Sequence, residues 1–572
     1  MNQDSSSQVA AARKVWRIQP PLPAEARSSL GKANYHPLLA RLLYNREIAD
    51  AHQAQAFLST EPISHDPLTL TGIEAAIHRL RRALEHRERI AVFGDFDVDG
   101  VTATALLARA LKPLGTEILP YIPHRVEEGH GLSLQAIHAL ARQNVDLLIT
   151  VDCGITSYIE IDAAARAGID TIVTDHHLAP EGPPRACAVV DPRLPGSRYP
   201  FPYLTGAGLA LKLVQALYHS MRRNDAPWQS LLPLAALGTV ADMAPLVDEN
   251  RSIVRQGLQE LGRTTTPGLR TLMRSAHLEG RVPDTEAISW VLAPRLNAAG
   301  RMDHASISYE LLVTESEERA TALAATLEQQ NRERQRITAE AQEKARTLIE
   351  LKPLLMVSDP SFSPGIVGLV AGKLVEEFCR PAVVVSLEEE VSRGSCRSIP
   401  EFDIGSALHR VAPSIGGFVR HGGHPRAAGF IIATEKLPAL RRELVALAQE
   451  SLGEEAFQPR LDIDLELPLG TLPRDIYRII EGLAPFGAGN PAPVFLSRNV
   501  QLAGMRPLGS NGEHLRLKLR DQGVTWDAIA FRLGAHLPAG ADSLDVVYTV
   551  DIDYWGGEET LRLNVMDLRA AE

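Results

Sequence analysis

Three aspartates on alternate residues form a potential metal-binding turn. Asp95, Asp97 and Asp99 follow the apolar run Ile90–Phe93 and precede a helical pattern over residues 102–111. A buried strand that ends in acidic residues and runs into a helix is typical of the ligand-binding edge of an open α/β sheet. Carboxylates spaced this closely repel one another unless protons or cations lie between them. The spacing therefore predicts a site for a hard divalent cation.

Two other interpretations of this turn are open when it is taken alone. One is an exposed acidic turn that holds no metal. The other is an EF-hand calcium loop, because the three aspartates and Gly100 match the first half of that motif. The EF-hand fails at its twelfth position, where Leu106 replaces the bidentate glutamate that the motif requires.

Two further predicted strands end in polar residues of the same kind. Strand 145–151 runs into Asp152, and strand 169–174 runs into the triplet Asp175–His177. Neighbouring strands of a parallel sheet deliver their carboxyl ends to one crevice, so these groups should converge with the acidic turn. Aspartate is also a common helix N-cap, which accounts for any one of these positions but poorly for three strand ends in succession.

Later segments add further polar groups. Asp242 lies in a mostly apolar segment and needs a partner there, because an unpaired buried charge is costly; a capping or salt-bridged aspartate is the alternative. Residues 293–302 are predicted to form a polar loop that carries Arg301. Segments 394–398 and 421–429 are predicted to be compact polar loops, whose glycines would let backbone N–H groups approach an oxyanion.

The order of the patterns predicts several domains of mainly α/β class. Strands alternate with helices in the first half, as in a parallel sheet, and a segment without glycine or proline predicts one long connecting helix. A second α/β unit follows, and the last hundred residues alternate as in a small β-barrel such as the OB-fold. The predicted divisions are an N-terminal extension packed on the first domain (1–69), a catalytic domain (70–314), a connector helix (315–350), a second α/β domain (351–455) and the barrel (456–572).

Composition narrows the class of protein. The chain has 572 residues, of which 45% are hydrophobic and 23% charged, as in ordinary globular proteins. Its net charge of −11 argues against a general nucleic-acid coat, although it allows a local basic groove. Four scattered cysteines predict neither a disulfide frame nor a zinc ribbon. The apolar runs are short and the N-terminus lacks signal-peptide features, so we expect a cytoplasmic protein without a membrane span.

Taken in order, the motifs resemble those of the DHH superfamily of phosphoesterases. Four segments resemble its four motifs: 94–100, 151–154, 175–177 and 238–243. Segments 394–398 and 422–429 resemble the associated DHHA1 domain. When the 294–302 segment and the barrel are included, the chain closely resembles the bacterial exonucleases specific for single-stranded DNA. This resemblance covers roughly residues 70–565.

The resemblance implies two bound Mn²⁺ or Mg²⁺ ions. The metal ligands that it implies are Asp97, Asp99, Asp152, His176 and Asp242. Asp95 would be an accessory acid and Asp175 would orient the histidines, while His177 would contact the scissile phosphate or assist proton transfer. Paired hard cations about 3.5–4 Å apart are the usual catalysts of such hydrolysis, and the imidazole of His176 tilts the preference towards Mn²⁺.

The same resemblance implies a site for the end of a DNA strand. Its implied residues for the terminal 5′ phosphate are Arg125, Arg301, Ser395 and Arg397. His424 would lie near the substrate phosphates. His130 stands where many relatives have a tyrosine thought to stack on the DNA. Arginine suits a terminal phosphate because its planar fork binds two oxygens at once.

The resemblance and these residues together imply a 5′→3′ exonuclease that is specific for single-stranded DNA and releases 5′-mononucleotides. The resemblance also implies that it acts in DNA repair and recombination. Its partners would be single-stranded DNA with a 5′ end and, from the resemblance, a single-strand-binding protein and a helicase; we expect a monomer. The connector and the two α/β lobes would enclose a groove too narrow for a duplex, and the barrel would let bases stack. Basic residues of the connector would either line this groove or form a solvated helix face: Arg332, Arg334 and Arg336.

Three alternatives stay open at this point. One is a purely structural α/β protein, against which the convergence of acids at the strand ends argues most strongly. A pyrophosphatase or a cyclic or oligonucleotide phosphodiesterase of the same superfamily would use the same metals, but it needs neither a barrel nor a long groove. A non-catalytic DNA-binding scaffold would have lost its metal ligands, whereas this chain keeps all the expected acids and His176.

Overall fold

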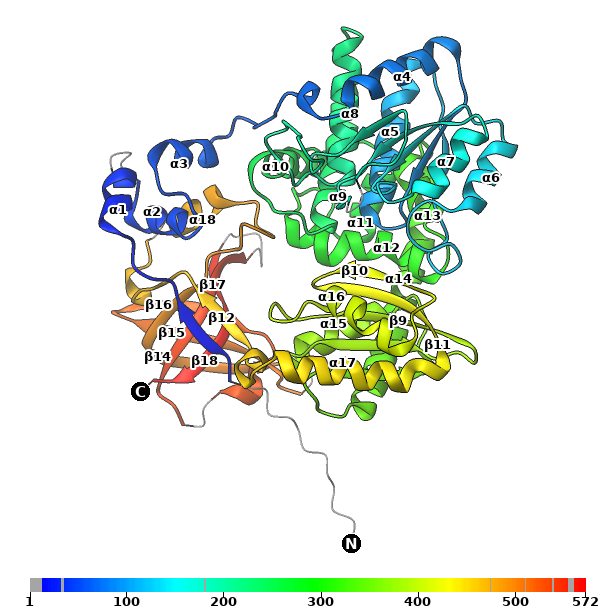
Figure 1. The fold of residues 1–572 in the computed structure, drawn as a ribbon. Coiled ribbons are helices and arrows are strands. Elements are labelled where there is room, and N and C mark those ends of the chain that lie inside the picture. Colours follow the sequence, from blue (N-terminus) through cyan, green and yellow to red (C-terminus); the bar gives the residue numbers. More distant parts are fainter. Residues whose placement is uncertain are drawn as a thin grey trace. The chain divides into compact units, whose positions relative to one another are not determined.

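The chain forms two compact units, residues 62–457 and a second unit made of residues 1–61 and 458–572 (Figure 1). The computed structural model describes residues 13–31, 35–179, 182–473, 475–509, 511–537, 540–553 and 560–571. Among these residues, no helix is long and apolar enough to cross a membrane.

A five-stranded parallel sheet forms the centre of the first domain, as predicted. In chain order its strands are β2 (Ile90–Gly94), β3 (Leu119–Tyr121), β4 (Leu147–Val151), β5 (Asp170–Thr174) and β6 (Ala188–Val190). Their order across the sheet is β3-β2-β4-β5-β6, with every pairing parallel. The chain therefore reverses its winding direction between β2 and β4, and a crevice opens at such a switch point beyond the strands' carboxyl ends.

Helices cover both faces of this sheet. Strand residues alternate between two apolar cores, as the two-residue period of a strand requires. The larger core packs against α4 (Ile73–His86), α5 (Val98–Leu111) and α8 (Gly206–Ser220), and the smaller core packs against α6 (Leu134–Arg142) and α7 (Tyr158–Arg166). The domain continues with α9 (Trp228–Ala241), α10 (Asp248–Gly262), α11 (Pro267–Ser275), the π-helix η3 (Ala287–Leu292), α12 (Ala293–Met302) and α13 (Ser306–Val313).

The prediction of a polar loop over residues 293–302 is wrong, because this segment is helix α12. Pro294 lies in the first turn, where proline is tolerated because its missing N–H has no helical partner. The alanines and leucine that follow are strong helix formers, and their side chains are buried. Helical geometry thus holds Arg301 in place, near the end of α12.

The predicted connector is confirmed as one helix, α14 (Glu317–Leu348), which leads into a second α/β domain. Its elements are β7 (Leu355–Asp359), α15 (Val367–Phe378), β8 (Ala382–Ser386), β9 (Val391–Arg397), α16 (Ile404–Val411), β10 (Arg420–His424), β11 (Ala427–Ala433) and α17 (Leu437–Ser451). The sheet order is β10-β11-β9-β8-β7, with only β7 and β8 parallel.

The prediction of compact loops at 394–398 and 421–429 is also wrong, because these segments lie mainly in β9, β10 and β11. Gly394 explains why a glycine-rich segment is a strand here. A Cβ atom on Gly394 would stand 2.1 Å from the Phe430 ring, so the glycine makes room for a neighbouring aromatic side chain.

The C-terminal strands close into the predicted OB-type barrel. They are β14 (Phe495–Leu508), β15 (His514–Asp521), β16 (Val524–Ala530), β17 (Ser543–Asp553) and β18 (Thr560–Ala570). Within this set each strand pairs with two others, and the circle β14–β15–β16–β18–β17 closes because β17 also pairs with β14. The elements that lead into the barrel are β12 (Arg460–Ile463), β13 (Leu465–Glu466) and α18 (Ile476–Leu483).

The N-terminal extension was expected to pack on the first domain, but its residues up to 61 belong to the same compact unit as the barrel. Strand β1 (Val15–Ile18) pairs in parallel with β12. Helices α1 (Ala24–Gly31), α2 (Pro37–Tyr44) and α3 (Ala51–Leu58) share one apolar core with the barrel strands. The end of the extension does contact the first domain, where the Ile63 backbone N–H donates to Ser252 Oγ at 2.8 Å. The apolar pattern of these helices correctly predicted that one face is buried, but it did not indicate which domain covers that face.

Candidate active site

The acidic turn lies where β2 passes into α5, as predicted. Asp97 caps the helix, because its carboxylate accepts hydrogen bonds from the backbone N–H groups of Asp99 at 2.9 Å and Gly100 at 3.2 Å. Gly100 is required here, since a Cβ atom would stand 2.4 Å from the backbone nitrogen of Asp95. The turn thus presents its three carboxylates at the switch point of the sheet.

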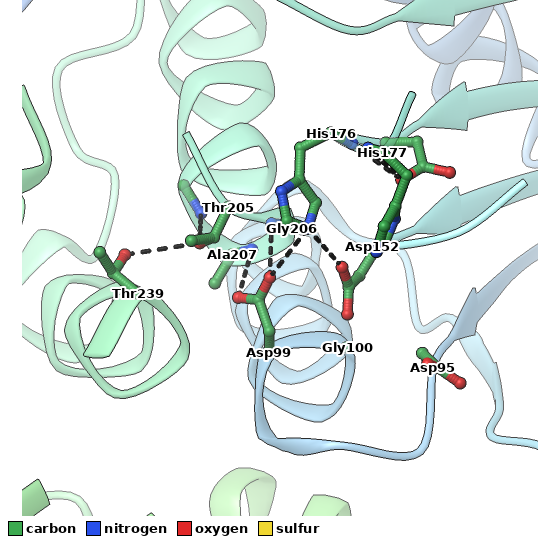
Figure 2. A network of polar contacts seen from close by, with 12 residues as sticks. Asp95, Asp99, Gly100, Asp152, His176, His177, Thr205, Gly206, Ala207 and Thr239 are labelled. Atoms are coloured by element: carbon green, nitrogen blue, oxygen red, sulfur yellow. Dashed lines mark hydrogen bonds and ion pairs between the residues drawn. The ribbon is translucent and has the colours of Figure 1, made fainter. Parts of the chain in front are cut away.

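Asp99 is held by the start of a distant helix. Its carboxylate accepts hydrogen bonds from the backbone N–H groups of Gly206 at 2.6 Å and Ala207 at 3.0 Å, in the first turn of α8 (Figure 2). A helix N-terminus favours a negative group of this kind. Gly238 on α9 also makes room for it, because a Cβ atom there would stand 2.4 Å from Asp99 Oδ1.

Asp152 and His176 meet from adjacent strands. His176 Nε2 lies 2.9 Å from Asp152 Oδ1 and 4.0 Å from Asp99 Oδ2, so the imidazole lies between the two carboxylates (Figure 2). The backbone of Asp152 has φ 62°, in the left-handed region that non-glycine residues seldom adopt. Strain of this kind persists where the surrounding structure fixes a functional side chain.

The potential metal ligands form groups whose donor atoms lie within 4.8 Å of one another. One group contains Asp99, His176 and Asp242, and another contains Asp95, Asp97 and Asp152; a third combines Asp152, His176 and His177. Asp95 Oδ1 is buried and has no hydrogen-bond partner in the described part of the chain. Carboxylate oxygens with one imidazole are donors that suit Mg²⁺ and Mn²⁺, so these residues fit two such ions.

Burial and mutual repulsion raise the pKa values of these carboxyl groups. The pKa of Asp99 rises to about 7, first because the group is buried and then because Asp97 is close. The pKa of Asp242 rises to about 8 for the same kind of reason, first burial and then the negative charges of Asp99 and Asp97. Burial and four surrounding aspartates also raise the pKa of Asp152 well above its usual range. A cation would relieve this repulsion by displacing the protons.

The two adjacent histidines have opposite protonation states. Burial, and then the positive charge of His177, lower the pKa of His176 to about 3, so it is neutral at pH 7. Burial would also lower the pKa of His177, but the hydrogen bond and charge of Asp175 outweigh it and raise that pKa to about 9. His177 Nδ1 lies 2.7 Å from Asp175 Oδ1, and the same oxygen accepts hydrogen bonds from the backbone N–H groups of His176 and His177. The neutral ring can bind a metal, and the charged ring can donate to a phosphate.

A cluster of partly buried arginines lies beside the acidic turn. This arginine cluster consists of Arg125, Arg301 and Arg397, together with the neighbouring Ser395. Burial, and then the other cations, lower the pKa of Arg301 well below its usual range. Arg397 Nη1 donates to Ser395 Oγ at 3.3 Å, and Arg301 Nη1 donates to the Gly365 carbonyl at 3.1 Å. None of the three arginines forms an ion pair with a described carboxylate, so together they favour an anionic ligand.

Models of three domain families match the chain: the DHH family N-terminal domain at residues 89–239, the DHHA1 domain at 352–450 and the RecJ OB domain at 463–567. The chain is 35% identical to the single-stranded-DNA-specific exonuclease RecJ of Bacillus subtilis, covering 98% of this chain and 72% of the relative. It is 33% identical to the RecJ of Thermus thermophilus, covering 98% and 79%.

The chain belongs to the RecJ family.

A solved structure of the family has the same fold. The crystal structure of RecJ from Thermus thermophilus in complex with Mn²⁺ is similar with a TM-score of 0.84 and 30% identity, covering 98% of this chain and 80% of that one. The structure of that RecJ in complex with Mg²⁺ gives a TM-score of 0.78 and 29% identity, covering 98% and 79%. The similarity therefore extends over both units of this chain.

The structure brings the RecJ-type residues that we predicted into two adjoining groups. The first comprises the acids and histidines around the strand ends, and the second is the arginine cluster. His424 comes from the second α/β domain, and its ring lies parallel to that of His177 with centroids 5.9 Å apart. His130 joins the acidic group, because its Nδ1 lies 2.8 Å from Asp95 Oδ2. The individual roles of these residues stay predictions.

Two of the connector arginines belong to a solvated helix face. Arg332 pairs with Glu328, and Arg336 pairs with Glu333 and Glu340, one turn away on the same helix. Arg334 differs, because it is partly buried and lies close enough to Arg301 to lower the pKa of that residue.

Sequence reasoning missed the residues that hold the acids in place. Gly206 and Ala207 were not predicted, although Thr205 and the small residues after it have the form of a helix N-cap that could have revealed them. Phe96 was also overlooked. It lies between two aspartates, and its residue type indicates only an ordinary core residue. The packing of Gly238 against Asp99 has no signal in a single sequence.

Proposed function

We propose that this protein is a 5′→3′ exonuclease specific for single-stranded DNA, which releases 5′-mononucleotides by metal-dependent hydrolysis. One observation carries the proposal: groups of metal-ligand residues adjoin an arginine cluster whose guanidinium groups form no close ion pair with a carboxylate of the described residues. Membership of the RecJ family supports the substrate, since relatives that match 98% of this chain are named for it.

Two Mn²⁺ or Mg²⁺ ions would be held by the two ligand groups. Asp99, His176 and Asp242 suit one ion, and Asp97 with Asp95 and Asp152 suits the other. Asp152 would help to hold either ion, because it belongs to one of these groups and its carboxylate also lies next to His176 of the other. When bound, such ions neutralise charge on the attacked phosphate and make a water molecule a stronger acid.

The surrounding side chains would bind and orient the phosphodiester. His177 is held as an imidazolium by Asp175, so it can donate a hydrogen bond to the scissile phosphate or a proton to the leaving oxygen. His424 approaches the same point from the second α/β domain. His176 stays neutral and available as a ligand.

The arginine cluster would bind the terminal 5′ phosphate of the strand. Arg125, Arg301 and Arg397 present partly buried guanidinium groups, and Ser395 adds a hydroxyl beside that of Arg397. A site that must hold a terminal phosphate before cleavage acts only at strand ends, which makes the enzyme an exonuclease. His130, beside Asp95 and Phe96, would stack on the DNA in this account.

The remaining assignments follow from the same proposal. The OB-type barrel supports single-strand binding, because such barrels accept stacked bases of any sequence. Action in repair and recombination would bring the enzyme to DNA in the cytoplasm, with a single-strand-binding protein and a helicase as partners, and as a monomer. The functional divisions would be 70–314 for catalysis, 351–455 for end binding and 456–572 for strand binding.

The substrate class is tested by offering the purified protein several phosphoesters with Mn²⁺. We expect hydrolysis of single-stranded DNA, little hydrolysis of a blunt duplex, and none with a chelator or in Asp152→Asn. Hydrolysis of pyrophosphate or a cyclic dinucleotide without any of single-stranded DNA would assign the protein to the small-molecule phosphoesterases. Binding of single-stranded DNA without any metal-dependent hydrolysis would make it a scaffold.

A further inference from the structure

Phe96 connects the metal ligands to the arginine cluster. It lies between Asp95 and Asp97 in the acidic turn, and its side chain is 1% exposed. The guanidinium carbon of Arg125 lies 4.0 Å from the centre of the Phe96 ring, a close cation–π contact. The His130 ring centroid lies 4.3 Å from the same ring. One aromatic side chain therefore contacts both side chains that loop 122–131 directs towards the site.

The same residue also contacts the helix that carries Arg301. Gly300 of α12 packs on Phe96 so closely that a Cβ atom there would stand 3.1 Å from the Phe96 carbonyl oxygen. Arg301 follows directly in the chain. Phe96 thus lies against the segments that carry two arginines of the cluster, while its neighbours in sequence are metal-ligand residues.

The second α/β domain holds loop 122–131 from the other side. Arg393 on β9 donates through Nη1 to the Val126 carbonyl at 2.5 Å. Arg420 on β10 donates through Nη2 to the His130 carbonyl at 3.0 Å. Gly129 lies under the Arg420 guanidinium, since a Cβ atom there would stand 2.9 Å from Arg420 Nη1. Both arginines bind backbone oxygens, so they fix where the loop lies whatever its side chains are.

We propose that Phe96, Arg393 and Arg420 are positioning residues that set the distance between the terminal-phosphate site and the metal ligands by clamping loop 122–131 between the two α/β domains. The inference rests on the proposed function, because the clamped loop carries Arg125. The distance decides which phosphodiester reaches the metals once the 5′ phosphate is bound. If the loop were loose, the metals would still bind. Binding of the 5′ phosphate would then no longer place the first phosphodiester bond correctly at the metal ligands.

The test compares single-stranded DNA with a 5′-phosphate and a 5′-hydroxyl end, each labelled at the 3′ end, with Mn²⁺. Phe96→Leu keeps an apolar side chain but removes the ring face, and Arg393→Ala/Arg420→Ala removes both backbone contacts. Arg410→Ala, at an exposed position on α16, is the matched control. The readout is the ratio of kcat/KM for the two ends, with Mn²⁺ binding and thermal unfolding measured alongside.

We expect the preference for the 5′-phosphate end to fall about tenfold or more in Phe96→Leu and in the double variant, with Mn²⁺ affinity retained and Arg410→Ala unchanged. If Phe96→Leu fails to fold, the double variant decides alone, because Arg393 and Arg420 contact the loop's outer side. The inference would be overturned if the folded variants kept the wild-type preference for the 5′-phosphate end. It would also be overturned if kcat/KM fell equally for DNA with a 5′ phosphate and DNA with a 5′ hydroxyl. A wild-type enzyme that cuts DNA without preferring the phosphate overturns it too, whereas one that does not cut DNA contradicts the proposed function itself.

Discussion

At the scale of single residues, the site depends on local environments that give chemically similar side chains different pKa values. His176 and His177 are neighbours in the chain, yet burial keeps one neutral while Asp175 keeps the other charged. Asp175 itself has a lowered pKa, because hydrogen bonding and the charge of His177 outweigh the effect of burial. The result is one imidazole that can bind a metal and one that can donate a proton at the same pH.

Asp175→Asn should therefore shift the pH dependence of catalysis. The carboxylate raises the pKa of His177, so replacing it lowers that pKa by about 1–3 units, and the alkaline limb of kcat/KM moves to lower pH. A pH–rate profile of wild type and variant, each with saturating Mn²⁺, checks the shift. An alkaline limb at the same pH in both proteins would mean that His177 does not act as the imidazolium.

Asp99→Asn tests the metal ligands directly. The amide removes the charge and places a donor near two backbone N–H groups, so we expect kcat to fall about 10²–10⁴-fold and Mn²⁺ affinity to weaken. Asp162→Asn changes an exposed aspartate on α7 and should leave both quantities unaltered. Mn²⁺ titration followed by kinetics distinguishes the two; equal activity of the two variants would remove Asp99 from the site.

The sequence alone predicted most of the acids because strand ends and residue types follow short-range rules. Asp95, Asp97, Asp99 and Asp152 each follow a recognisable apolar strand, and the parallel topology makes such ends converge. It could not predict Phe96, whose contacts with Arg125 and His130 depend on how a distant loop folds back. A single sequence records residue types, whereas these contacts are tertiary.

At the scale of elements, two wrong predictions have one cause. Residues 394–398 and 421–429 are rich in glycine and polar residues, and local composition favoured loops. Both segments lie mainly in strands because cross-strand pairing and the packing of Phe430 against Gly394 outweigh local propensity. The prediction of a loop at 293–302 failed for a related reason, since the buried side chains of α12 stabilise a helix there.

The N-terminal helices should stabilise the barrel rather than the catalytic domain. Leu42 on α2 is fully buried in the core that these helices share with the barrel, so Leu42→Ala should cost about 2–5 kcal/mol in that unit. Hydrogen exchange resolved by peptide should become faster in β14–β18 and stay unchanged in β2 and β4. The exposed Ile159→Ala on α7 is the control, and faster exchange in β2 and β4 with a protected barrel would contradict this assignment.

At the scale of the whole molecule, the metal site makes stability depend on pH. The pKa values of Asp99 and Asp242 are about 7 and about 8, against 3.8 for an ordinary aspartate, so the metal-free folded protein binds protons that the unfolded chain has released. A group whose pKa is raised by folding contributes stability that is lost as pH rises through the folded-state value. The metal-free protein should therefore lose stability through this site as the pH rises from about 4 to about 8.

Mn²⁺ should offset that loss. We expect the gain in Tm at saturating Mn²⁺ to be larger at about pH 8.5 than at about pH 6, because at low pH the ion must displace protons. Scanning calorimetry with and without Mn²⁺ at both pH values measures this gain in Tm. Comparing the two gains separates the contribution of the metal site from that of other titrating groups. Asp242→Asn should reduce the difference, and a gain that is the same at both pH values in the wild type would contradict the raised pKa values.

The direction of cleavage tests the central claim most directly. Single-stranded DNA with a 5′ phosphate and a 3′ label is incubated with the wild-type protein and Mn²⁺, and the labelled products are sized over time. Cleavage from the 5′ end predicts a ladder of labelled strands that shorten step by step, with unlabelled 5′-mononucleotides as the released product. Immediate release of the label as a mononucleotide would mean attack from the 3′ end, and the assignment of the arginine cluster to the 5′ phosphate would be wrong.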